Sequence, residues 1–195
     1  MSSEAEKIAA VATGDESALA ELYGQYADKV YNTALSYTLN REDAEDITQD
    51  VFVKIHRASG QFRGDASLNT WIYRITVNTT INHVEKCRRY RLLKGNMTPP
   101  PAEAFRHPGA LPENQEDTAE LYRAIDKLTV NQKTAFILSY LEELPRQEVA
   151  DVMGTTLKAV ESLLHRAKRS MRTELKERYP GRLRSRQPSK IINRS

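Results

Sequence analysis

A run of acidic and amide side chains between positions 42 and 50 is the part of the sequence most able to carry chemistry. Carboxylates at helical spacing can act as general acids and bases or bind a divalent cation. No histidine, glycine-rich loop or metal-ligand motif stands among them, so an enzyme using Asp46 and Asp50 with magnesium or manganese is a weakly supported rival. The same side chains could form a solvated face, stabilise a helix N-terminus, or dock on a basic partner.

The sequence contains one cysteine, Cys87, and four histidines. A single cysteine excludes an internal disulfide framework and a zinc site built from several cysteines, and it fits a reducing cytosol. The histidines, at positions 56, 83, 107 and 165, are too dispersed to suggest a site, so we expect neither a metal nor a cofactor. Basic neighbours could lower the pKa of the Cys87 thiol and make it redox-reactive, but an ordinary thiol is the simpler interpretation.

The formal net charge of +3 conceals alternating blocks of charge. Residues 1–53 sum to −8, residues 54–94 to +7, residues 95–157 to −5 and residues 158–195 to +9. Basic blocks of this size favour phosphate backbones, whereas acidic blocks repel them. The pattern predicts two nucleic-acid-binding surfaces, with two merely solvated basic helix faces as the alternative.

The composition is that of a soluble globular protein, with 39% hydrophobic and 28% charged residues. No run of about 18 apolar residues could span a membrane, and the acidic N-terminus lacks the apolar segment of a signal peptide. We therefore expect a cytoplasmic protein with no membrane insertion.

Five of the eight prolines lie between residues 95 and 115. Because proline breaks helices, this stretch is predicted to be a semi-extended linker. The predicted organisation is a first lobe over 1–94, the linker over 95–115, a second lobe over 116–178, and a basic, disordered tail over 179–195. Each lobe is small for an independent core, so packing on a partner would stabilise both.

Apolar residues at helical spacing predict three main helices in the first lobe. The first covers residues 18–37, and Asn40 is a good cap for the second, which runs to about Ala58. A polar turn over residues 62–67 precedes the third helix, which spans residues 68–93. No strand-like alternation occurs in the sequence, so the predicted fold class is all-α.

The second lobe is predicted to be a helix-turn-helix domain. Helical patterns cover residues 118–128 and 131–141. They are followed by a helix over residues 145–153, a turn at Gly154, and a basic helix over residues 157–178. In this layout the last helix enters the major groove of DNA, with its N-terminal residues near the base edges.

Three strings carry a resemblance that covers about residues 15–94 and 116–175. They are DAEDITQDVFVKIHR (43–57), FRGDASLNTWIYRITVN (62–78) and EELPRQEVADVMGTTLKAVESLLHRAKRSM (142–171). In this order, and split by a proline-rich linker, they resemble bacterial RNA polymerase sigma factors of the extracytoplasmic-function (ECF) group. The length fits the minimal form of that family, two helical domains called regions 2 and 4 joined by a linker.

The resemblance implies a function without covalent chemistry, so the chain is not expected to be an enzyme. Such a factor binds core RNA polymerase and directs it to promoter DNA. It reads the −10 element as a melted strand with region 2 and the −35 element as duplex with region 4. An anti-sigma protein is a further partner implied by the resemblance alone.

The resemblance also assigns site residues in three sets. The polymerase-binding set is Glu42, Asp43, Glu45, Asp46, Gln49 and Asp50. The −10 set, which would border a pocket for an unstacked base and track the single strand, is Phe62, Arg63, Gly64, Asp65, Ala66, Ser67, Asn69, Tyr73, Arg74 and Asn78. The −35 set is Lys158, Glu161, Ser162, His165, Arg166, Lys168 and Arg169.

Some of these regions have a plainer interpretation. Trp71 could stack on a base, but it shares the apolar stripe of its helix, so we expect it in the core. Glu161 stands where relatives often carry a lysine; it could accept a hydrogen bond from cytosine or pair with His165 or another cation. The basic residues between 86 and 91 could contact phosphates or cap their helix.

Two further functions stay open from the sequence. A dimeric helix-turn-helix regulator would explain residues 142–178 but not the two strings before the linker, and it would bind spaced half-sites without polymerase. A pure interaction module would dock on polymerase without reading DNA.

Overall fold

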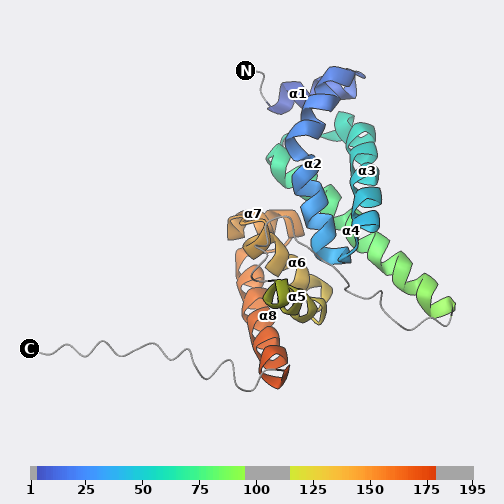
Figure 1. Cartoon of the computed structure of the whole chain (residues 1–195). Coiled ribbons are helices and arrows are strands. Elements are labelled where there is room, and N and C mark those ends of the chain that lie inside the picture. The colour runs from blue at the N-terminus through green and yellow to red at the C-terminus, as the bar shows by residue number, and fades with distance from the viewer. Residues whose placement is uncertain (1–3, 95–114, 179–195) are drawn as a thin grey trace, which may run out of the picture.

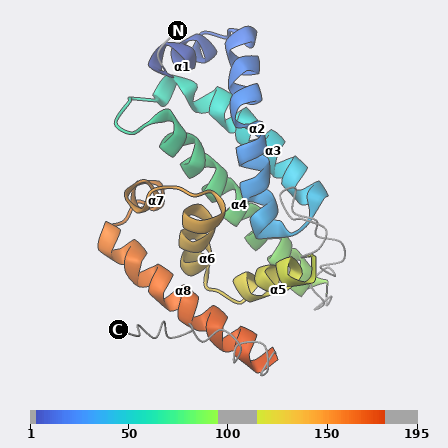
Figure 2. The same cartoon turned by 60° about the vertical axis from the view of Figure 1, so that its left-hand side comes forward.

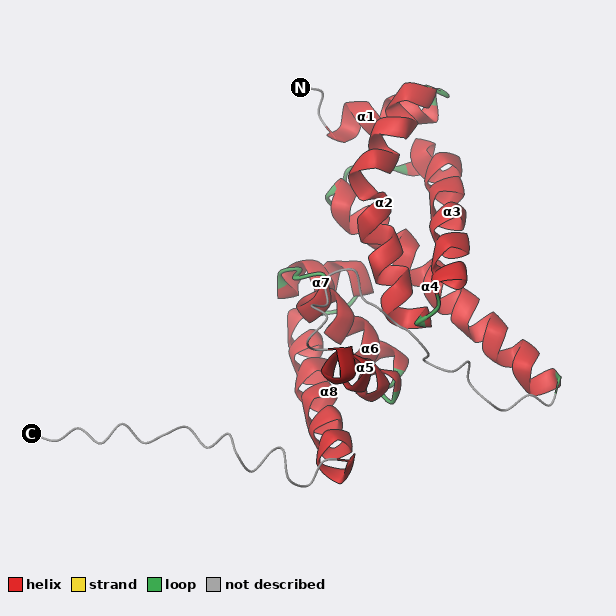
Figure 3. Ribbon diagram, viewed as in Figure 1, coloured by secondary structure: helices red, strands yellow, loops and turns green. Residues whose placement is uncertain are grey.

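The structure, a computed structural model, describes residues 4–94 and 115–178. Every regular element within these residues is a helix (Figure 3), which confirms the predicted all-α class. The helices form an N-terminal lobe, α1 to α4, and a C-terminal lobe, α5 to α8 (Figure 1). The predicted linker, apart from its last residue, and the predicted tail lie outside the described residues.

The N-terminal lobe is a group of four helices around one core. They are α1 (Glu4–Ala12), α2 (Glu16–Thr38), α3 (Arg41–Ala58) and α4 (Leu68–Leu93), with a 3-10 turn at Ser59–Gln61. The helices α2, α3 and α4 pack on one another, and α1 covers one end of them (Figure 1). Their apolar stripes bury Leu22, Ile47 and Ile72 almost completely, as the helical periodicity predicts.

Short polar side chains set the starts of these helices. Asn40 Oδ1 accepts a hydrogen bond from the Asp43 backbone N–H at 3.1 Å, so α3 begins where the sequence predicts. Ser67 Oγ accepts from the Thr70 N–H, also at 3.1 Å, at the start of α4. Each cap satisfies an N–H that the first helical turn leaves without an intrahelical partner.

The C-terminal lobe contains the predicted helix-turn-helix. Its helices are α5 (Gln115–Asp126), α6 (Val130–Phe136), α7 (Arg146–Met153) and α8 (Leu157–Arg178). Gly154 ends α7 with a φ of 61°, a left-handed conformation that glycine adopts without a steric penalty. Thr156 Oγ1 then accepts from the Ala159 N–H at 3.2 Å and starts α8. A short helix, a glycine turn and a long basic helix are therefore confirmed.

The predicted helix over residues 131–141 is present, but its second half changes from α to π geometry. The helix α6 ends at Phe136, and Ile137–Leu141 form a wider π-type turn, closed by a 3.0 Å hydrogen bond from the Glu142 N–H to the Ile137 oxygen. The wider turn breaks the helical register, a change that apolar spacing alone does not reveal. As a result Leu138 is fully buried while the Glu142 side chain reaches the N-terminal lobe.

The two lobes share hydrophobic cores. One buried cluster belongs to the N-terminal lobe, but two others combine residues of both lobes. Tyr37 of α2 joins residues of α5, α6 and α8 in the second cluster, and Tyr73 and Val77 of α4 join Leu138 and Val149 in the third. Figure 2 shows α7 beside α4, where this packing occurs. Each lobe therefore completes the other, as their small size requires.

A buried lysine fixes the way in which the lobes meet. Lys133 of α6 is 8% exposed, and its Nζ donates to the backbone oxygen of Tyr37 at 3.1 Å and to Asp126 Oδ1 at 3.0 Å. The Tyr37 hydroxyl donates to Thr134 Oγ1 at 2.8 Å. Separating or shifting the lobes would leave these buried groups unsatisfied unless water replaced the bonds, so the seam favours one register.

Candidate nucleic-acid and protein interfaces

The polar side of α3 is an exposed acidic surface. Its exposed members, at the spacing of one helix face, are Glu42, Glu45, Asp46, Gln49 and Asp50. The sixth residue of the predicted polymerase-binding set, Asp43, is half-buried, and its Oδ1 lies 3.1 Å from Nε2 of His83 on α4. Asp43 is therefore turned toward α4, whereas the other five residues are open to a partner.

A shallow groove of about 380 Å³ lies between α2 and α3 beside this acidic surface. Tyr23 lines it from α2, opposite Glu45 and Gln49 on α3. Tyr23 is 49% exposed, and its ring packs on that of Phe52 with centroids 4.6 Å apart. Helical spacing beside the buried residues Leu22 and Tyr26 favours a core position for Tyr23, so the sequence pattern does not reveal its exposure. Its exposure adds an apolar anchor to the charged face.

The loop over residues 62–67 carries the first part of the predicted −10 set. Gly64 has a φ of 75°, in the left-handed region that favours glycine. Phe62 packs against Trp71 with ring centroids 5.4 Å apart, and Trp71 packs against the N-terminal core cluster, which confirms its expected place. The remaining loop residues that are exposed or half-buried are Arg63, Asp65, Ala66 and Ser67.

The next two members of the −10 set bond to the C-terminal lobe. Asn69 Nδ2 donates to Glu148 Oε1 at 2.5 Å, and the Tyr73 hydroxyl donates to Glu142 Oε2 at 2.9 Å. Both acceptors are carboxylates, so the bonds are charge-assisted when these groups are ionised. Donors predicted to meet a DNA strand are thus already engaged by an acidic part of the same chain.

Arg74 continues this contact beside a hollow. Its Nε and Nη2 donate to the backbone oxygen of Asp151 at 2.9 and 2.6 Å. The hollow, of about 470 Å³, lies between the 62–67 loop and α7, and Arg74 and Glu148 are among its lining residues. Asn78, the last member of the −10 set, is exposed. A pocket is therefore present at the predicted loop, but α7 forms its second wall.

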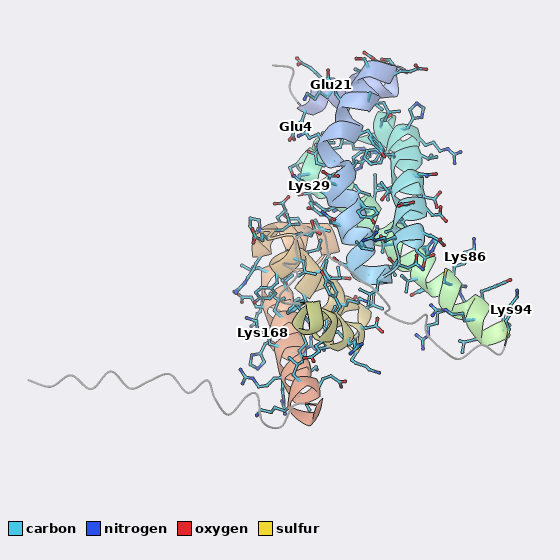
Figure 4. All side chains as sticks on the ribbon, in the orientation of Figure 1. Glu4, Glu21, Lys29, Lys86, Lys94 and Lys168 are labelled. Carbon is cyan, nitrogen blue, oxygen red and sulfur yellow. The ribbon has the colours of Figure 1, made fainter. Side chains whose placement is uncertain are left out.

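Glu142 is an ionisable group inside the contact between the lobes. Burial raises the pKa of its carboxyl above the ordinary 4.5, while the hydrogen bond from Tyr73 and the charge of Lys29, which extends from α2 (Figure 4), oppose the rise. Burial also raises the pKa of the Tyr73 phenol. Because burial disfavours the charged carboxylate, ionisation of Glu142 works against closure of the lobes.

The predicted −35 set lies on α8 and is open to solvent. All seven residues are exposed, namely Lys158, Glu161, Ser162, His165, Arg166, Lys168 and Arg169. Six of them recur at the spacing of one helix face, and the exception is Lys168. The Nζ of Lys168 lies 4.7 Å from the ring centroid of Tyr140, so this ammonium group is partly engaged within the lobe.

Glu161 has a partner that the sequence analysis did not name. Its Oε1 lies 3.7 Å from Nη1 of Arg146 on α7, and both side chains are about half exposed. An exposed pair of this kind contributes little to stability and can be broken by a ligand. Arg166 Nε donates to the Ser162 backbone oxygen at 3.3 Å, which leads the guanidinium back along the exposed face of α8.

The end of α4 is a basic arm. Its last turns project beyond the helices of both lobes (Figure 1), and Lys86 and Lys94 extend from this part of the helix (Figure 4). The basic side chains here that are exposed are Lys86, Arg88, Arg89 and Lys94. Leu93 is 86% exposed at its tip. This placement leaves the basic residues accessible to a phosphate backbone.

Comparison with known proteins agrees with this layout. The model of Sigma-70 region 2 matches residues 22–90, and that of Sigma-70, region 4 matches residues 118–171. The RNA polymerase sigma-H factor of Pseudomonas aeruginosa is 32% identical over 170 residues, which cover 83% of this chain and 88% of the relative. The ECF RNA polymerase sigma-E factor of Escherichia coli is 33% identical over the same shares of the two chains. The chain belongs to the ECF group of sigma-70 factors.

Solved sigma-factor structures share the fold. The sigma factor RpoE of Bartonella quintana, in complex with the anti-sigma factor NepR, gives a TM-score of 0.65 at 21% identity, over 80% of this chain and 95% of that one. The structure of CnrH with the cytosolic domain of CnrY gives 0.64 at 20% identity, over 89% and 97%. At these identities the likeness supports the fold.

As an ECF sigma factor, the chain directs RNA polymerase to promoters in transcription initiation. Its relatives are initiation factors rather than enzymes. The region 2 match covers α2 to α4 and the region 4 match covers most of α5 to α8, so each match falls on one lobe. No helix in the described part of the chain is long and apolar enough to cross a membrane.

Region 2 also brings together three residues that the sequence analysis kept apart. One ligand-type atom each from Asp43, His83 and Cys87 lie within 4.8 Å of one another. All three residues are partly buried. The sequence signal that could have found two of them is the spacing of four residues between His83 and Cys87, one helical turn. The third residue, Asp43, lies on another helix, so only the folded structure places it beside the other two.

The structure favours the simpler interpretation of Cys87, an ordinary thiol, over the alternative in which basic neighbours lower its pKa. Partial burial, followed by the negative charge of Asp43, raises the pKa of the thiol, and these effects outweigh Arg91 and Lys86. Residues adjacent in sequence point to different sides of a helix, so a flanking lysine affects a thiol less than a carboxylate across the helix contact. An activated, redox-reactive thiol is therefore not supported.

Proposed function

We propose that this sigma factor reads the −10 element as a melted strand through the 62–67 loop and α4, and the −35 element as duplex through α8. The observation that carries the proposal is the coincidence of each predicted reading set with one surface of the matched region. The predicted −35 face of α8 is exposed and carries Lys158, Arg166 and Arg169, as suits a recognition helix in the major groove.

Docking on core RNA polymerase is assigned to the acidic side of α3. The five exposed polar residues of that helix offer a field that would speed and orient association with a basic partner. The adjoining groove, with the exposed ring of Tyr23, supplies apolar area for a buried anchor. Exposed charges alone contribute little affinity. The acidic face and the apolar groove together therefore support docking better than either one alone.

Capture of a −10 base is assigned to the hollow beside the 62–67 loop. Its volume of about 470 Å³ falls in the range of pockets that hold small ligands. Arg74 lines it, and Asn69 donates to its lining residue Glu148, so both donors could meet a flipped base and its phosphate once released. Because α7 closes one side, strand capture requires the lobes to separate.

Separation of the lobes is assigned to docking on polymerase. The free chain holds the −10 donors against Glu142, Glu148 and Asp151, so free region 2 presents an occupied surface. The energy of polymerase docking would shift the population toward the open form, as any ligand that favours one state does. An anti-sigma protein, as in the Bartonella complex, would act in the opposite direction if it favours the closed form.

In vitro transcription with purified core polymerase tests this function. Adding the chain should produce sequence-selective initiation on a promoter library, and Asp46→Lys should lower both core binding and initiation because it reverses a charge on α3. Glu21→Lys, the same reversal at an exposed site on α2, is the matched control. Folded protein that binds core but starts no transcript from any promoter would refute promoter recognition and leave a docking module.

A further inference from the structure

Three side chains of metal-ligating type meet where α3 and α4 pack. The Oδ1 of Asp43 lies 3.1 Å from Nε2 of His83, and these two residues and Cys87 each offer an atom within 4.8 Å of the others. Two ligands bound to a tetrahedral zinc ion at about 2.0–2.1 Å are separated by about 3.3 Å. The three groups therefore need only small side-chain adjustments to share one ion.

The helices α3 and α4 hold these residues in place, and the contact between Asp43 Oδ1 and His83 Nε2 joins two of the ligand atoms directly. His83 and Cys87 are one turn apart on α4 and so lie on the same side of that helix. Asp43 sits in the first turn of α3, where Asn40 accepts a hydrogen bond from its backbone N–H and its carboxylate faces His83. The contact between α3 and α4 belongs to the core of region 2 and sets the distance between the two helices.

The ligand types indicate which ion would bind. Thiolate and imidazole groups favour zinc-like transition ions over magnesium or calcium, which prefer oxygen ligands. Three protein ligands leave one position for water, the coordination of an open zinc site. We propose that Asp43, His83 and Cys87 form a binding site for one zinc-class divalent cation.

The surroundings predict the strength of the site. A thiolate and a carboxylate together balance the two charges of the ion, whereas the nearby cations Lys86 and Arg91 oppose its approach. We therefore expect affinity below that of a closed four-ligand site. An imidazole and a carboxylate alone would form only the observed ion pair, so Cys87 is the residue that distinguishes a metal site from a structural contact.

A bound ion would link the first turn of α3, where the acidic surface begins, to α4. Asp43 would be neutralised and the first turn of α3 held more firmly, so the ion would change the surface assigned to polymerase docking. This consequence rests on the proposed function, whereas binding of the ion does not. Core binding measured with and without zinc is therefore a separate readout from ion binding.

Cobalt titration of the reduced full chain, followed by zinc displacement, tests the site. Wild type should bind one cobalt per monomer with a thiolate-to-metal charge-transfer band, and zinc should abolish the band. Cys87→Ser should lose the band, and His83→Ala and Asp43→Asn should each lower affinity by about tenfold or more, as loss of a ligand does. The matched control is His56→Ala, an exposed histidine on α3 outside the cluster, which should bind as wild type does.

Three outcomes would overturn the site. They are absence of a thiolate band in wild type, unchanged affinity in His83→Ala, and one ion per two chains, which would mean that Cys87 bridges molecules. A zinc-induced rise in melting temperature of wild type but not of Cys87→Ser provides a second measurement. It keeps the proposal testable if Asp43→Asn is too unstable for titration.

Discussion

The two surfaces assigned to promoter DNA differ in availability. On α4, Asn69, Tyr73 and Arg74 already donate to acceptors of the C-terminal lobe, whereas the donors of α8 face solvent. Under the proposed function, Glu142, Glu148 and Asp151 engage donors that a −10 strand would need. Closure of the lobes would then control −10 reading and leave −35 reading free.

The largest effect is expected from locking the lobes together. Asn69→Cys with Glu148→Cys, in a Cys87→Ser background, places two thiols at a contact that a short bis-maleimide can span. Crosslinked protein should initiate transcription at least about tenfold less than the same variant without crosslinker, a difference of about 1.4 kcal/mol or more. Binding of −35 duplex should change little, because the seven −35 residues of α8 are already exposed when the lobes are closed.

The uncrosslinked double variant is its own control for the loss of the Asn69 and Glu148 side chains. Equal initiation by crosslinked and uncrosslinked protein would show that the closed arrangement does not block −10 reading. If crosslinked protein loses −35 duplex binding to the same extent as initiation, closure affects both surfaces.

A smaller effect is expected from single substitutions on the open surface. Arg166→Ala and Lys158→Ala should each weaken −35 duplex binding by about 1–3 kcal/mol if their contacts to bases are bidentate. Lys168→Ala removes the same charge but should cost less, since its ammonium lies over the Tyr140 ring rather than on the common face. Fluorescence anisotropy with duplex DNA measures all three, with core binding as the control.

If Lys168→Ala weakens duplex binding as much as the other two substitutions or more, the DNA-reading face of α8 lies closer to the π-type turn than proposed. Loss of core binding in Arg166→Ala would remove that residue from the −35 set.

Local features of the sequence were enough to place the helices. Asn40 starts α3 and Gly154 ends α7 at the predicted positions, because a cap acts on the backbone within three or four residues. The π-type turn at Ile137–Leu141 was missed because its apolar spacing is also that of a continuous helix. The position at which a helix changes from α to π geometry therefore depends on the residues that pack against it.

The contact between the lobes could not be predicted in the same way. It depends on residues about a hundred positions apart, such as Tyr37 and Thr134, whose pairing no local pattern encodes. The clustering of His83 with Asp43 has the same cause, since the partner lies 40 residues away on another helix. Site residues assigned by resemblance were placed on the expected elements, but their engagement by the other lobe follows from tertiary packing alone.

The smallest effect concerns the pH dependence of closure through Glu142. Its pKa is raised in the closed form, so protonation favours closure: the contribution is complete below the ordinary value of 4.5 and is lost as pH rises through the raised pKa. Glu142→Gln keeps an acceptor for the Tyr73 hydroxyl without the charge. It should increase the ratio of closed to open protein at neutral pH by about 2- to 10-fold, the range of about 0.5–1.5 kcal/mol for one polar group.

Single-molecule energy transfer between dyes on exposed positions of α2 and α8 measures the closed fraction directly. Wild type should open progressively as pH rises through this window, and Glu142→Gln should lose that dependence. Glu120→Gln removes the same charge from α5 and should behave as wild type. If Glu142→Gln opens the lobes instead, the carboxylate strengthens the seam through its bond to Tyr73. The acidic contact would then hold region 2 closed more firmly at neutral pH than in acid.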